Sequence, residues 1–176
     1  MIPSLLLLHA TAFGCDDLEP VPDTFQVAWI SPVDQQIAQN GLMEVVRVRD
    51  LRTWSLEHSD DSVEDKTNAL LHSLGILERD ETPEEAYKVT LFDVQPEWLC
   101  RPMREIPADN IVEGVGACTR RQAKSISGHK AGYTGCGYSM DTTASTRGLD
   151  VFRIPWATAS SQGFCVLPLD RFIEGA

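Results

Sequence analysis

The sequence predicts an α+β domain with a largely antiparallel sheet and one or two short helices. Candidate strands occur in both halves of the chain, helical periodicity is confined to the middle, and prolines interrupt the stretch that follows. The chain has 176 residues, of which 43% are hydrophobic and 23% charged, and this is enough to bury one core. We expect a single globular domain over residues 25–176.

Two strands are predicted near the start of this domain. Residues 24–31 (TFQVAWIS) are rich in strand-forming side chains and are stopped by Pro32. An Asn-Gly turn at 40–41 separates them from residues 42–49 (LMEVVRVR), in which hydrophobic and charged side chains alternate at the end. Both segments therefore fit neighbouring strands of one sheet.

The middle of the chain predicts two helices. The first is short and covers residues 50–57. The second begins at Ser62, whose spacing to Asp65 is that of a capping box, and ends at Gly75. Its apolar side chains share one helical face: Val63, Thr67, Leu70, Leu71 and Leu74.

Three further strands are predicted after the helices. Residues 86–94 (AYKVTLFDV) form the first, and residues 148–156 and 163–172 form the last two. Prolines at 96, 102 and 107 exclude a long helix or a central strand over residues 95–108.

The first fifteen residues have the pattern of an export signal. Residues 1–14 carry no charged side chain, contain the run Leu5–Leu8, and end in small residues before Cys15. The ending AFGC resembles the lipobox of bacterial lipoprotein signal peptides. This resemblance implies that residues 1–14 are removed, that Cys15 is lipidated, and that the acidic, proline-rich residues 15–24 tether the domain to an envelope membrane.

Two alternatives stay open for this segment. Cleavage after Ala12 by an ordinary signal peptidase would export the chain and leave Cys15 unmodified. In a cytoplasmic protein, the run of leucines would instead be a buried strand.

The cysteine count agrees with export. If Cys15 carries lipid, four cysteines are left, and an even number in an exported chain predicts two disulfides. Of the three pairings, neighbours in sequence are the default: Cys100 with Cys118, and Cys136 with Cys165. No C-x₂₋₄-C pair and no suitably spaced histidine pair is present, so the sequence predicts no metal site.

The charge is unevenly distributed along the chain. The net charge is −11, yet residues 111–176 carry five acidic and seven basic side chains. Such an acidic chain is not expected to bind nucleic acid. The segment 114–148 combines seven glycines with a group of cations, and a long loop of this kind favours binding of an anion such as a carboxylate, phosphate or sugar acid. The candidate ligands are Arg120, Arg121, Lys124 and Lys130. A surface loop whose cations balance the acidic half is the alternative.

The sequence contains no nucleotide-binding motif, and it predicts no cofactor. We therefore expect a non-catalytic envelope lipoprotein that serves as a binding or accessory module, with an envelope protein or an anionic glycan as partner. A small hydrolase or transferase is the alternative, with His129 as base and Cys136 as nucleophile.

Overall fold

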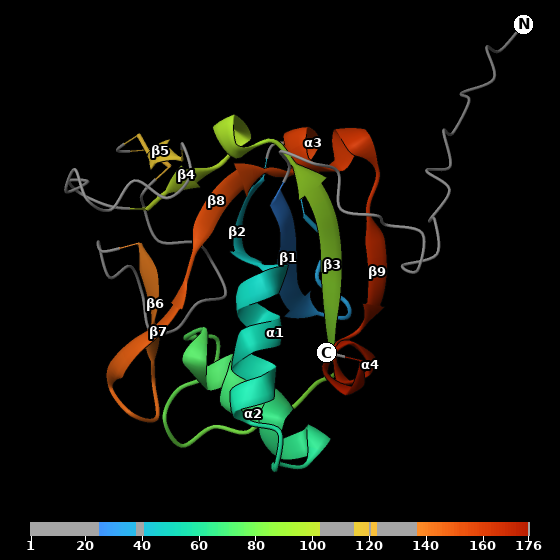
Figure 1. The fold of residues 1–176 in the computed structure, drawn as a ribbon, viewed down its shortest axis with the longest axis vertical. Coiled ribbons are helices and arrows are strands. Elements are labelled where there is room, and N and C mark those ends of the chain that lie inside the picture. Colours follow the sequence, from blue (N-terminus) through green and yellow to red (C-terminus); the bar gives the residue numbers. More distant parts are fainter. Residues whose placement is uncertain (1–24, 38–40, 103–114, 120, 123–136, 176) are drawn as a thin grey trace, which may run out of the picture.

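The computed structural model describes residues 25–37, 41–102, 115–119, 121–122 and 137–175. Its described strands form a seven-stranded sheet in the order β5-β4-β8-β2-β1-β3-β9 and a separate two-stranded sheet, β6-β7 (Figure 1). The strand bounds are β1 Phe25–Pro32, β2 Leu42–Arg47, β3 Tyr87–Val94, β4 Cys100–Arg101, β5 Gly116–Ala117, β6 Tyr138–Asp141, β7 Thr146–Asp150, β8 Phe152–Pro155 and β9 Cys165–Pro168.

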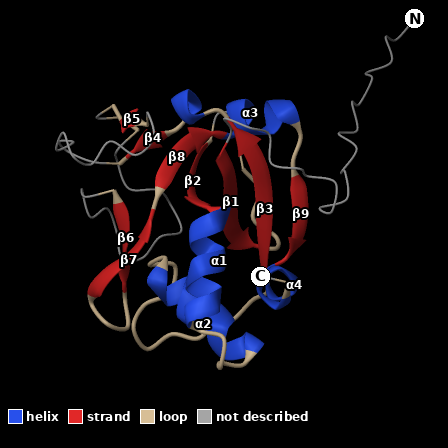
Figure 2. Cartoon of the chain, viewed as in Figure 1, coloured by secondary structure: helices blue, strands red, loops and turns tan. Residues whose placement is uncertain are grey.

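Short helices accompany the sheet (Figure 2). Their bounds are α1 Val48–Glu57, α2 Val63–Ser73, α3 Trp156–Ala159 and α4 Leu169–Glu174, with 3-10 helices η2 Pro96–Trp98 and η4 Ser160–Gln162. The first two are the helices predicted from the sequence. The short helices α3 and α4 were not predicted.

The sheet is antiparallel apart from one pair. Strand β1 pairs with β3 along its whole length, from Phe25 opposite Val94 to Pro32 opposite Tyr87. Among the described strands, β4 and β5 alone run parallel. The predicted α+β class with a largely antiparallel sheet is therefore confirmed.

Two hydrophobic clusters form because side chains of the central strands alternate between the faces of the sheet. One face carries Ala28 and Ile30 of β1 and packs against α1, α2 and α4. The other face carries Val27 and Trp29, and there the cluster extends over Phe92, Phe152 and Ile154 to α3.

The local signals in the first half of the chain led to the correct elements. Ser62 caps α2, and its Oγ accepts a hydrogen bond of 3.1 Å from the backbone N–H of Asp65. The helix is followed by Gly75, whose φ of 68° suits glycine. The predicted strand 42–49 is shorter than expected, because the chain turns into α1 already at Val48.

Two predictions near the C-terminus were wrong in detail. Residues 148–156 are divided between two sheets: β7 pairs with β6, whereas β8 pairs with β2. Residues 163–172 contain only the four-residue strand β9 and then enter α4 directly after Pro168. The apolar side chains Leu169, Phe172 and Ile173 have helical spacing and are buried in the first cluster.

Candidate functional site

The structure joins Cys100 and Cys118 in a disulfide, as predicted from neighbouring positions in the sequence. The two Cα atoms lie 4.7 Å apart, and both residues are buried. Cys165 is also disulfide-bonded and is 2% exposed. The predicted lipidation site Cys15 and the predicted disulfide partner Cys136 lie outside the described residues, as does His129.

Most of the predicted anion ligands also lie outside the described residues: Arg120, Lys124 and Lys130. Arg121 is described and is exposed. Near the end of the same segment, the exposed Arg147 of β7 lies over the ring of Tyr138 at 5.0 Å.

The two ends of segment 118–137 are attached to the same short strand, β4. The N–H of Cys118 donates to the carbonyl of Arg101 at 2.8 Å. The N–H of Gly137 donates to the carbonyl of Pro102 at 3.2 Å, and its own carbonyl accepts from Nε of Arg101 at 3.3 Å. Together with the Cys100–Cys118 disulfide, these bonds hold both ends of the segment close to one point of the sheet.

A cluster of guanidinium groups lies beside this point, which we call the Asp150 cluster. The carboxylate of Asp150 is 2.6 Å from Arg147, 2.8 Å from Arg101 and 3.9 Å from Arg47. The Nε of Arg47 also donates to Asp50 at 2.6 Å. These three arginines outnumber the two aspartates, so the cluster has an excess of positive charge.

Two arginines of the Asp150 cluster are unusually buried. The side chain of Arg101 is 3% exposed and that of Arg47 is 10% exposed. Both guanidiniums approach the ring of Phe152, at 5.5 Å for Arg47 and 5.9 Å for Arg101. A buried guanidinium is tolerated only when it is paired and hydrogen-bonded, so Asp150 is the residue on which this arrangement depends.

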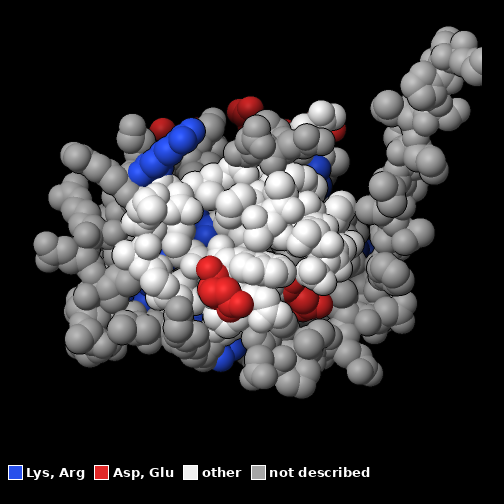
Figure 3. Space-filling view, turned by 90° about the horizontal axis from the view of Figure 1, so that it is seen from above, with Lys and Arg blue, Asp and Glu red and all other residues white. Residues whose placement is uncertain are grey.

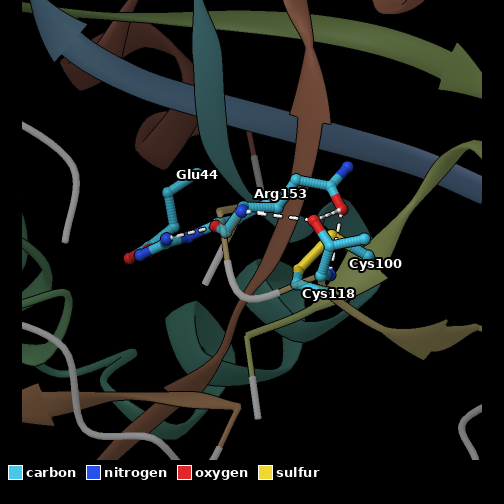
Figure 4. The surroundings of a disulfide bond; sticks show 6 residues. Glu44, Cys100, Cys118 and Arg153 are labelled. Atoms are coloured by element: carbon cyan, nitrogen blue, oxygen red, sulfur yellow. Dashed lines mark hydrogen bonds and ion pairs between the residues drawn. A yellow bond between two sulfur atoms is a disulfide. The ribbon is translucent and has the colours of Figure 1, made fainter. Parts of the chain in front are cut away.

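Arg153 forms a second buried ionic contact, next to the disulfide. Figure 4 shows it between Glu44 and the bond joining Cys100 and Cys118. Its Nη2 lies 3.1 Å from Oε2 of Glu44, and its Nη1 donates to the carbonyl of Gln122 at 2.6 Å. Arg153 thus holds the chain shortly after Cys118 against the sheet.

A buried histidine occupies the joint between α2 and the β6-β7 hairpin. Nδ1 of His72 lies 2.7 Å from Oγ1 of Thr142, and its Nε2 lies 3.1 Å from the carbonyl of Glu81. The neighbouring Ser73 donates to Asp141 at 2.9 Å. Serine, histidine and aspartate are therefore close together, but the serine binds the aspartate and the histidine binds the threonine. A Ser-His-Asp catalytic system requires the histidine between the other two, so this group is a structural joint.

The end of the molecule that carries α3 presents a largely uncharged described surface (Figure 3). Beneath it, the half-buried Trp156 contacts Phe164, Phe92 and Trp29 with ring centroids 5.3, 5.7 and 6.3 Å apart. These rings belong to the second hydrophobic cluster.

A groove of about 520 Å³ lies beside β3 and β9. Its lining is mainly apolar and includes Tyr87 and Val166, and Lys88 is its basic residue. The ammonium of Lys88 donates to the carbonyls of Val33 and Gln35, so it is engaged in holding the turn after β1. The lining also contains two carboxylates, those of Glu85 and Asp170.

Comparison with known proteins gives no relative: no family model, curated protein or solved structure matches this chain. In the part of the chain that the structure describes, no group of three or more His, Cys, Asp or Glu side chains is placed to hold a metal ion. Within the same residues, no helix has the length and hydrophobicity needed to span a bilayer.

Proposed function

We propose that this chain is an exported, non-catalytic binding module of the bacterial envelope whose segment 114–148 takes an anionic ligand. The observation that carries the proposal is the attachment of residues 118–137 to β4 at both ends, through Cys118 and Gly137. A loop fixed at its base on a rigid sheet is a common way to present binding residues.

The charges at this base support an anion as ligand. On a chain with a net charge of −11, segment 114–148 carries five basic side chains and one acidic side chain. The buried Arg47 and Arg101 add positive charge near the described ends of the segment at β4, since the Asp150 cluster holds more arginines than aspartates. Guanidinium groups bind carboxylates and phosphates through paired hydrogen bonds, so either group fits as the ligand's charge.

Oxidised cysteines support export. The Cys100–Cys118 bond and the bonded state of Cys165 fit a thiol-oxidising compartment, where such links persist. An envelope protein or an anionic glycan is the partner that the location and the charge favour. A lipid on Cys15 would anchor the module to a membrane. Lipidation requires that the sulfur of Cys15 forms no disulfide.

Ligand binding is tested by equilibrium titration with inorganic phosphate and with polygalacturonate, a polymer of sugar acids. We expect binding that weakens as salt is added, because the contacts are ionic. The double variant Arg120→Ala/Arg121→Ala is expected to bind about tenfold more weakly, a difference of about 1.4 kcal/mol.

The matched control is the double variant Arg52→Ala/Arg79→Ala, which removes two exposed arginines outside the segment. It changes the net charge equally and should leave binding within twofold of the unmodified protein. Absence of binding to both probes, or equal weakening by the two double variants, would contradict the proposal.

A further inference from the structure

Cys165 in β9 takes part in a disulfide whose partner is restricted to two residues. The chain has five cysteines, and Cys100 and Cys118 are bonded to each other. Cys165 is disulfide-bonded as well, so its partner is Cys15 or Cys136. The positions of described neighbours distinguish these two candidates.

Chain connectivity argues against Cys136 as the partner. It directly precedes Gly137, and consecutive Cα atoms are about 3.8 Å apart. Gly137 is hydrogen-bonded to Pro102, the residue after β4. In the sheet order, β4 and β9 are five strand positions apart, which is about 24 Å at about 4.8 Å per strand. Figure 1 shows β4 and β6 on one side of the molecule and β9 on the opposite side.

A disulfide requires Cα atoms within about 7 Å of each other. Starting from Gly137, one residue and one disulfide together reach about 11 Å, less than half of the distance across the sheet. The pairing of Cys136 with Cys165 that neighbouring positions suggest is therefore excluded by the strand order.

Cys15 can reach β9 easily. Ten residue steps separate it from Phe25, which begins β1, and ten extended residues span up to about 33 Å. β1 is two strand positions from β9 in the sheet, and β3 between them places Leu91 opposite Cys165. We propose that Cys15 and Cys165 form a disulfide that ties the N-terminal segment to the edge strand β9.

The reaction that forms this bond is a thiol–disulfide exchange. The two thiols lose two protons and two electrons, and a disulfide of the oxidising compartment, on a protein or a small molecule, is reduced to two thiols. The bond uses the sulfur atom that a lipid would occupy, so lipidation at Cys15 and this disulfide exclude each other. Cleavage after Ala12 is then the export route that fits, and Cys136 is the cysteine left over.

The proposal is tested by mapping disulfides in the full chain. Reduced protein is refolded in a glutathione redox buffer, alkylated, and digested without reduction, and the linked peptides are identified by mass spectrometry. We expect Cys15 linked to Cys165, Cys100 linked to Cys118, and Cys136 alkylated. A peptide linking Cys136 to Cys165 would overturn the proposal.

Two single variants provide a matched comparison. Cys136→Ser should keep both links and contain no free thiol. Cys15→Ser should contain two free thiols, at Cys136 and Cys165, because these two cannot reach each other. Release of Cys165 in the Cys136→Ser variant would contradict the proposed pairing.

The lipid is tested separately in the chain expressed with its own N-terminus in a bacterium. An unlipidated mass that retains Cys15 supports the disulfide, whereas a diacylglyceryl group on Cys15 overturns it. The proposed disulfide and the proposed anion binding are independent, except that both assume an oxidising compartment. Phosphate titration of the same refolded protein therefore shows whether anion binding survives a failure of the proposed pairing.

Discussion

Arg101 of β4 and Asp150 of β7 form an ion pair of 2.8 Å that connects the seven-stranded sheet to the small β6-β7 sheet. Arg101 is buried, and the same side chain binds the carbonyl of Gly137. One arginine therefore positions both the hairpin and the end of the basic segment. The position of the proposed anion site depends on this contact.

Replacing Asp150 should destabilise the fold strongly. In the variant Asp150→Asn, the buried guanidinium of Arg101 loses its counter-charge, and Arg47 keeps only Asp50. Leaving a buried charge unpaired costs about 3 kcal/mol of unfolding free energy. Chemical denaturation monitored by tryptophan fluorescence measures this loss.

The exposed member of the Asp150 cluster provides the control. The side chain of Arg147 is 60% exposed, and its ion pair with Asp150 is therefore solvent-screened. Arg147→Ala should change the unfolding free energy by less than about 1 kcal/mol. Equal losses for the two variants would show that burial of Arg101 does not determine the energetics of the cluster.

Much of the fold could be predicted because its signals are local. The strand-forming side chains of residues 24–31 and 86–94 and the cap at Ser62 depend on neighbours within a few positions, and they led to β1, β3 and α2. Residues 163–172 also carried a local signal, the helical spacing of Leu169, Phe172 and Ile173. A strand was predicted instead, because the hydrophobic run before Pro168 is typical of a strand.

The ionic groups could not be predicted because their contacts join distant positions. Arg47 alternates with valines and so resembled a solvent-facing residue of a strand, yet it is buried against Phe152. Arg153 pairs with Glu44, 109 positions earlier in the chain. No spacing in the sequence encodes such a pair. The division of residues 148–156 between two sheets could not be predicted for the same reason. It occurs next to Asp150, whose carboxylate pairs with the distant Arg101.

The close contact between β7 and α2 gives a steric prediction. A Cβ atom at Gly148 would lie 2.0 Å from the carbonyl oxygen of Ser73 and 2.5 Å from Oγ of Ser139. Gly148→Ala should therefore push the β6-β7 hairpin away from α2 and cost about 1–3 kcal/mol. Hydrogen exchange should become faster in β6 and β7, and the thermal midpoint should fall.

Gly116 in β5 is the matched control, since a Cβ there would meet nothing within 4 Å. Gly116→Ala should leave the hydrogen exchange of the hairpin and the thermal midpoint unchanged. If both alanine variants behave alike, the contact at Ser73 does not dock the hairpin.

Burial of Asp93 predicts a pH dependence of stability. Burial raises the pKa of this carboxyl above its ordinary 3.8, and a hydrogen bond with Gln26 on β1 opposes the shift. Its buried Oδ1 accepts no hydrogen bond from the described residues. Between 3.8 and the raised pKa, the folded protein binds more protons than the unfolded chain, so the stability contributed by Asp93 falls as pH rises through this window.

Asp93→Asn removes this titration and keeps the size of the side chain. Urea denaturation from pH 3 to pH 7 should show the variant gaining stability relative to the unmodified protein as pH rises through this window, and then levelling off. The exposed Asp34 provides the control, because Asp34→Asn changes the net charge equally without emptying a buried position. A difference that is constant over the whole range, or one that Asp34→Asn reproduces, would show that burial of Asp93 is not its cause.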